Sequence, residues 1–141
     1  MRALIAGGCG FVGLNIAEAL LRRGDGAVLF DANPLNSEAA RAFDALPGDY
    51  VVCQGDVRDP GSVAAAFAEG NIDAVFYGAA MTSGPERERD APDQVLAVNL
   101  SGLINALKAA AAAGGVRRVI NISSGSAYGR HRMEGAGAVV E

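Results

Sequence analysis

Short apolar runs alternate along the chain with longer segments in which apolar residues recur at helical spacing. The apolar runs predict strands, and the longer segments predict helices. Because the predicted strands are nearly continuous apolar runs, both faces of their sheet should be covered. Alternating strands and helices favour a single α/β domain over residues 1–141, a Rossmann-type doubly wound parallel sheet flanked by helices. The expected strands are Arg2–Ala6, Ala27–Asp31, Tyr50–Gln54, Ala74–Tyr77 and Arg118–Ile122, and the expected helices are Phe11–Arg23, Ser37–Leu46, Pro60–Glu69 and Pro92–Ala113.

Polar and turn residues at the ends of these segments indicate helix boundaries. Asp59 stands just ahead of Pro60, and Asp90 stands just ahead of Pro92, so both are predicted N-caps. The pair Gly114-Gly115 follows the longest helix as a stop signal. The charged segment Glu86 to Asp90 is predicted to be a solvated loop or a helix entry.

Composition narrows the class of protein. Half of the 141 residues are hydrophobic and the net charge is −4 with scattered basic residues, so we expect no nucleic-acid partner. No apolar run approaches the roughly 20 residues of a membrane helix, so we expect no membrane partner. The N-terminus lacks the pattern of a signal peptide, and Cys9 and Cys53 are too few for a disulfide framework. These features predict a cytoplasmic protein with reduced thiols. We also expect no metal site, because His131 is the only histidine and no cysteine cluster accompanies it.

Gly7, Gly10 and Gly13 join the first predicted strand to the first predicted helix. Glycine permits a tight turn and close backbone approach, and the helix N-terminus attracts an anion such as a pyrophosphate. Asp31 ends the next apolar run, about 20 residues on, where an acid can accept hydrogen bonds from an adenosine ribose. A carboxylate there repels a 2′-phosphate, so the pattern predicts NAD rather than NADP as cofactor. The alternative is that the glycines serve turn geometry alone and that Asp31 caps a strand.

Further motifs follow in a fixed order. Asp56-Val57 comes after the third predicted strand, and Ala79-Ala80 comes after the fourth. Asn99 lies in the longest predicted helix, and the segment Ser123 to Gly129 reads Ser-Ser-Gly-Ser-Ala-Tyr-Gly. With the glycine segment and Asp31, these motifs resemble the extended short-chain dehydrogenase/reductase family, in its NAD-dependent nucleotide-sugar epimerase/dehydratase branch. The resemblance covers only the N-terminal, cofactor-binding part of such an enzyme.

The resemblance implies roles for individual residues. It places an adenine contact at Asp56 and Val57, and it implies that Asn99 helps to organise the active site. It makes Ser124 the catalytic serine that contacts the reacting hydroxyl. Tyr77 stands where the family usually has histidine, and we expect it to pack rather than to catalyse. The cofactor-binding residues implied are Gly7, Gly10, Phe11, Val12, Gly13, Asp31, Asp56, Val57, Ala79, Ala80 and Asn99.

The family's catalytic pair Tyr-x-x-x-Lys does not occur in this sequence. The only lysine is Lys108, and no tyrosine stands four residues before it. Tyr128 and Arg132 have the spacing, but an arginine is a poor electronic substitute for lysine, so we assign this spacing to chance. We therefore expect the chain to be either the N-terminal part of a longer enzyme or a natural truncation, with the C-terminal substrate part absent in both cases. We expect it to be inactive alone.

Three functions are consistent with these residues. The first is an NAD-dependent epimerase/dehydratase-type enzyme that acts on a nucleotide sugar by transient hydride transfer. The second is an NAD-dependent dehydrogenase of a sugar acid or hydroxysteroid, and the third is a non-catalytic NAD-binding sensor. Ser124 favours an enzyme over a sensor. A small-molecule substrate is the expected partner, and a homodimer is possible; Thr82 and Ser83 could lie on the substrate side.

Overall fold

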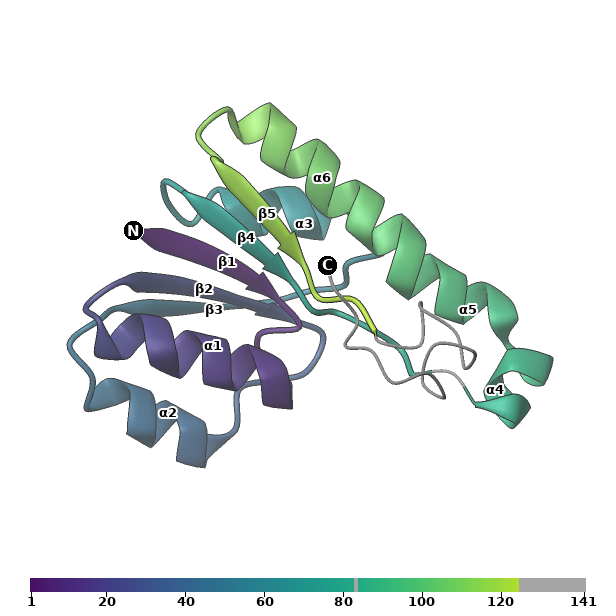
Figure 1. Cartoon of the computed structure of the whole chain (residues 1–141), viewed down its shortest axis with the longest axis horizontal. Helices are drawn as coiled ribbons and strands as arrows, with labels where there is room; N and C mark the ends of the chain where they lie inside the picture. Colours follow the sequence, from purple (N-terminus) through teal and green to yellow (C-terminus); the bar gives the residue numbers. More distant parts are fainter. Residues whose placement is uncertain (83, 125–141) are drawn as a thin grey trace, which may run out of the picture.

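The computed structural model describes residues 1–82 and 84–124 of the chain. Its centre is a five-stranded parallel sheet in the order β3-β2-β1-β4-β5, which confirms the predicted fold class (Figure 1). The strands are β1 (Arg2–Ala6), β2 (Gly26–Asp31), β3 (Tyr50–Gln54), β4 (Ala74–Tyr77) and β5 (Arg118–Asn121). The helices are α1 (Phe11–Arg22), α2 (Ser37–Asp44), α3 (Pro60–Phe67), α4 (Pro85–Asp90), α5 (Pro92–Leu96) and α6 (Gly102–Ala113), with a π-helical turn, η1 (Ala97–Ser101), between α5 and α6.

Helices cover both faces of the sheet. Figure 1 shows α1 and α2 on one face and α3 and α6 on the other. Along β1, Leu4 and Ala6 are buried against the α3 and α6 side, whereas Ala3 and Ile5 are buried against α1. The buried positions Ala3 to Ala6 of β1 are all apolar because both faces of the sheet are packed, which explains the unbroken apolar runs in the sequence.

One of the two predicted side-chain caps is present in the structure. The carboxylate of Asp59 accepts hydrogen bonds from the N–H groups of Gly61 (3.0 Å) and Ser62 (3.1 Å) at the start of α3, as predicted. The predicted cap at Asp90 is wrong. Asp90 is the last residue of α4, its carboxylate pairs with Arg89 at 2.7 Å, and α5 begins after Ala91 without a side-chain cap.

The segments α5, η1 and α6 form one continuous helical rod of 22 residues, Pro92–Ala113. Its mean hydropathy reaches 1.5, so by length and composition alone it could cross a membrane. The expectation that no apolar segment approaches that length is therefore wrong, because alanines and leucines outweigh the few polar residues of the rod. Ala106 and Ala110 pack in the core beside α3, and one helix of this kind is weak evidence for a membrane span.

The central strand places the carboxyl ends of three strands side by side. Ala6, the last residue of β1, is in register with Phe30 of β2 on one side and Tyr77 of β4 on the other. In the sheet, β2 and β3 lie on one side of β1, whereas β4 and β5 lie on the other side of β1. In open parallel sheets, a crevice for ligands forms at such a reversal of strand order.

Candidate functional site

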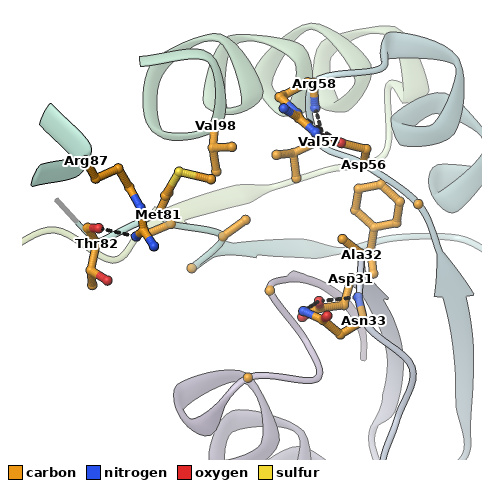
Figure 2. A pocket seen from close by; sticks show the side chains of 17 residues that line it. Asp31, Ala32, Asn33, Asp56, Val57, Arg58, Met81, Thr82, Arg87 and Val98 are labelled. Atoms are coloured by element: carbon orange, nitrogen blue, oxygen red, sulfur yellow. Dashed lines mark hydrogen bonds and ion pairs between the residues drawn. The ribbon is translucent and has the colours of Figure 1, made fainter. Parts of the chain in front are cut away.

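A cavity of about 440 Å³ opens at this reversal, between the glycine turn after β1 and the loops after β2, β3 and β4 (Figure 2). Of the expected cofactor residues, the structure brings together here Gly7, Gly10, Asp31, Asp56, Val57, Ala79 and Ala80. The remaining lining residues are Phe30, Ala32, Asn33, Gly55, Arg58, Gly78, Met81, Thr82, Arg87 and Val98.

The glycine turn runs close against the loop after β4. Gly7 has a φ of +79°, and a Cβ placed on it would lie 2.8 Å from the backbone nitrogen of Ala79. A Cβ on Gly13 would collide with the carbonyl oxygen of Gly7. Larger residues at these positions would separate the turn from β4 or from α1, so the turn needs glycine for its conformation as well as for its close approach.

The N-terminus of α1 points its backbone N–H groups toward this turn without a side-chain cap. Gly10 is the N-cap residue, and the first turn of α1 contains no acidic side chain. By contrast, the side chain of Asn36 accepts a hydrogen bond of 2.8 Å from Ala39 at the start of α2. The first N–H groups of a helix have no partner within the helix, so α1 offers donors and the positive end of its dipole to an anion.

Asp31, at the carboxyl end of β2, connects the glycine turn to the next loop. One carboxylate oxygen accepts a hydrogen bond of 3.0 Å from the backbone N–H of Cys9. The other accepts from the backbone N–H of Asn33 at 2.9 Å. These bonds hold the half-buried carboxylate at the edge of the cavity, where it still has lone pairs available for ligand hydroxyl groups.

Asp56 is held by an arginine that the sequence interpretation did not single out. Its carboxylate accepts hydrogen bonds from Arg58, from the backbone N–H at 2.8 Å and from Nε at 3.0 Å (Figure 2). Hydrogen bonds from the Arg58 side chain and backbone hold the pKa of Asp56 below its ordinary value. The only sequence signal for this pair is a basic residue two positions after the acid.

A second arginine lines the opposite end of the cavity. The Nη1 of Arg87, from α4, donates to the carbonyl oxygen of Thr82 at 2.7 Å (Figure 2). Alternating charges in this segment predicted a solvated loop or a helix entry and gave no reason to single out Arg87. Thr82 lies at this end of the cavity, whereas Ser83 lies outside the described residues.

Several expected residues do not line the cavity. Phe11 and Val12 begin α1 with exposed side chains, 84% and 47% accessible. The side-chain amide of Asn99 bonds to the backbone of Met81. Ser124 follows the carboxyl end of β5 and is exposed. Their roles stay predictions.

Tyr77 is buried at the end of β4. It is only 3% exposed, and its hydroxyl donates to the carbonyl oxygen of Val98 at 2.7 Å. Burial, with a smaller contribution from the charge of Asp56, raises the pKa of Tyr77 to about 12. A phenol of this kind stays protonated at neutral pH, so Tyr77 is a poor base.

Within residues 1–82 and 84–124, no group of three or more histidine, cysteine or acidic residues is arranged to hold a metal ion. His131, Tyr128 and Arg132 fall outside the described residues, so the structure says nothing of them.

The sequence and the structure are both similar to those of known enzymes. A model of the NAD dependent epimerase/dehydratase family matches residues 3–137. The chain is 36% identical over 128 residues to a 3 beta-hydroxysteroid dehydrogenase/Delta 5-->4-isomerase of Mycobacterium tuberculosis, covering 89% of this chain and 32% of the relative. It is 32% identical over 131 residues to UDP-glucuronate 4-epimerase 1 of Arabidopsis thaliana, covering 89% of this chain and 30% of that protein.

Among solved structures, the fold matches a UDP-glucose-4-epimerase from Stenotrophomonas maltophila, crystallised with bound NAD and formylated UDP-arabinopyranose. The TM-score is 0.79 with 33% sequence identity, and the match covers 92% of this chain and 38% of that one. The chain therefore spans about a third of the length of the curated relatives it matches.

Proposed function

This chain belongs to the NAD-dependent epimerase/dehydratase family, and from that premise we propose that its cavity is the NAD site of an enzyme that transiently oxidises a nucleotide sugar. One observation carries the proposal. The uncapped glycine turn, Asp31, and the Asp56-Val57 pair line the same cavity, although they lie far apart in the sequence.

The residues of the cavity fit the parts of NAD. Backbone N–H groups at the start of α1 suit the pyrophosphate. Because Gly7 has no side chain, the pyrophosphate can approach the backbone of the glycine turn closely. The Asp31 carboxylate suits the two hydroxyls of the adenosine ribose and repels a 2′-phosphate. Asp56 accepts from the exocyclic amine of adenine, and Val57 packs against the ring. When bound, NAD supplies the hydride acceptor.

Ser124 is the catalytic residue that we propose within this chain. It follows β5, so it lies at the same edge of the sheet as the other strand ends. There its hydroxyl orients the substrate oxygen by hydrogen bonding. Because the sequence has no Tyr-x-x-x-Lys and Tyr77 is a poor base, we propose that the 141-residue chain binds NAD but does not turn over substrate alone.

We also propose that the protein is a cytoplasmic homodimer. Leu96, Leu100, Ile104 and Leu107 form an exposed stripe along the helical rod, with 60%, 53%, 41% and 45% of each residue accessible. A second copy carries the same stripe, so a two-fold axis can bring the two rods together and cover both. Light scattering should give a dimer mass that falls to the monomer mass for Leu100→Glu. If the unmutated chain is a monomer, the homodimer proposal fails, whereas the proposed NAD site is unaffected.

A hydroxysteroid dehydrogenase is the second candidate, because the Mycobacterium tuberculosis relative is 36% identical to this chain. The two functions differ in their net reaction. An epimerase returns its cofactor to the oxidised state, whereas a dehydrogenase releases NADH.

The test has two stages. Calorimetric titration of the chain should show NAD binding at one site and weaker binding of NADP, and no NAD binding would overturn the proposal. If the residues encoded after Glu141 include a Tyr-x-x-x-Lys, the longer protein is assayed with UDP-sugars and 3β-hydroxysteroids. Epimerised sugar without net NADH supports the epimerase, and NADH release with a steroid supports the dehydrogenase. If that motif is absent, the NAD-binding sensor is favoured.

A further inference from the structure

We propose that Tyr77 is a positioning residue for the cavity: through Val98 and Asn99, its hydroxyl holds the wall formed by the loop after β4. The proposal rests on the proposed NAD site and adds a role to a residue that otherwise only fills the core. Tyr77 itself does not line the cavity, whereas Val98 and Met81 both do.

The first link is the hydrogen bond from Tyr77 to Val98. It joins β4 to the helical rod through two residues that are 21 positions apart in the sequence, with an oxygen–oxygen distance of 2.7 Å. Gly102 makes room for the hydroxyl, because a Cβ there would collide with it and would lie 2.7 Å from Cγ2 of Val57. Because its pKa is about 12, the hydroxyl remains a donor throughout the neutral range.

The second link is the π-helical turn η1, which includes Val98. In this turn the N–H of Gly102 donates to the carbonyl of Ala97, five residues back, instead of to Val98, four residues back. The Val98 carbonyl thus loses its usual helical donor, and the Tyr77 hydroxyl supplies one in its place. This hydrogen bond is partly buried, and a carbonyl group shielded from water needs a partner, so Tyr77 stabilises the wide turn.

The third link is the contact between Asn99 and Met81. Asn99 follows Val98 in the wide turn, and its side-chain amide behaves like a second peptide group toward Met81. Its oxygen accepts from the Met81 N–H at 2.8 Å, and its nitrogen donates to the Met81 carbonyl at 3.0 Å. This pair of bonds fixes the loop Gly78–Met81, which lines the cavity beside the glycine turn.

The chain of contacts explains why a tyrosine, and not only an apolar ring, is useful at position 77. A phenylalanine would fill the same volume but leave the Val98 carbonyl without its donor. The wide turn could then relax, and the Asn99 amide would no longer face Met81 in a fixed orientation. A merely structural tyrosine would lower stability without changing the cavity wall.

Three variants of the chain test the proposal: Tyr77→Phe, Asn99→Ala and the double variant. The control is Tyr50→Phe, which removes a hydroxyl that donates to Asp44 at 2.9 Å, away from the cavity. The readouts are the NAD dissociation constant by calorimetry and amide hydrogen exchange at Met81. We expect Tyr77→Phe to weaken NAD binding about fivefold, the effect of one lost hydrogen bond, and to speed exchange at Met81. Tyr50→Phe should change neither.

The double variant tests whether Tyr77 acts on the cavity through Asn99. If Tyr77 acts through Asn99, Tyr77→Phe has no further effect on NAD binding once Asn99 is alanine. Additive effects, or a Tyr77→Phe variant that melts earlier but keeps both readouts within twofold of the unmutated chain, would overturn the proposal. If the unmutated chain does not bind NAD, the proposed function fails, and Met81 exchange alone decides the role of Tyr77. If Tyr77→Phe does not fold, Gly102→Ala provides the second variant, because it displaces the hydroxyl and retains the ring.

Discussion

The carboxylate of Asp31 accepts a hydrogen bond from the backbone N–H of Cys9, at 3.0 Å, and thereby fastens the glycine turn to the end of β2. This bond orients the acid and the turn relative to each other before any ligand arrives. Preorganisation of this kind lowers the entropy lost on binding.

Asp31→Ala should weaken NAD binding and narrow the difference between NAD and NADP. The variant loses hydrogen bonds to the ribose hydroxyls and no longer repels a 2′-phosphate. We expect a loss of about 1.5–3 kcal/mol in NAD binding, typical of a hydrogen bond to a charged group. Calorimetry with both cofactors measures it. The control Asp44→Ala removes an acid outside the cavity and should leave both affinities unchanged, while equal affinity of the unmutated chain for NAD and NADP would contradict the role of Asp31.

Gly7→Ala and Gly24→Ala separate backbone strain from steric contact. Both glycines have a φ of +79°, but a Cβ on Gly24 meets nothing within 4 Å, whereas one on Gly7 meets the backbone of Gly78 and Ala79. Gly24→Ala should lower the free energy of unfolding by about 1–2 kcal/mol, the cost of a left-handed non-glycine residue. Gly7→Ala should lose more and also abolish NAD binding. Urea unfolding and calorimetry measure the two quantities, and equal losses for both variants would mean that the close approach is unimportant.

The pair of Asp56 and Arg58 predicts a dependence of stability on acid pH. Because Arg58 lowers the pKa of Asp56 in the folded state below its ordinary value of 3.8, the folded state binds the Asp56 proton less readily than the unfolded state does. The pair therefore stabilises the fold above the ordinary value, and this contribution is lost as the pH falls through the lowered pKa. Asp56→Asn should be less stable than the unmutated chain near neutral pH, and the difference should shrink as the pH falls below 3.8 and through the lowered pKa of Asp56. Urea unfolding across this range tests it; a difference independent of pH would assign the effect to packing.

Gly102→Ala should destabilise the chain because its Cβ would displace the Tyr77 hydroxyl and press on Val57. Overpacking in a core costs about 1–3 kcal/mol. Adding Tyr77→Phe removes the first of these collisions, so the double variant should recover part of the loss. Thermal and urea unfolding of the four chains measure the coupling. Strictly additive losses would show that Gly102 is small for a reason unrelated to Tyr77.

Most of the fold could be predicted from the sequence, because buried parallel strands leave unbroken apolar runs such as Ala3–Ala6. The helix α4 was less clear, since the alternating charges of Pro85–Asp90 provide no apolar face. The predicted cap at Asp90 was wrong for the same reason: this segment forms α4, and the Asp90 carboxylate pairs with the neighbouring Arg89 instead of capping α5. The π-turn was not foreseen, because its wider hydrogen bonds leave no mark in a helical pattern of alanine and leucine.

Gly7 was predictable because a tight turn between a strand and a helix needs glycine, and its φ is +79°. Asp31 was predictable because it follows the glycine turn at the interval where an acid can bind a ribose, and Asp56 only through the resemblance to a known family. All three residues line the cavity. Arg58 and Arg87 were missed because the sequence of a polar segment does not distinguish an arginine that lines a cavity from one that faces solvent. Only the fold shows that both line the cavity. The partner of Asn99, the backbone of Met81, depends on a contact 18 residues away that no local pattern encodes.

The position of β5 has a consequence for handling the protein. Within residues 1–82 and 84–124, β5 ends the sheet beyond β4, so one side of its backbone lacks a strand partner in that part of the chain. Edge strands of this kind can pair with strands of other molecules and lead to aggregation. The strand is short, and it begins with the exposed Arg118, a charge that disfavours such pairing. Replacing Arg118 with an apolar residue should therefore reduce solubility before it reduces stability.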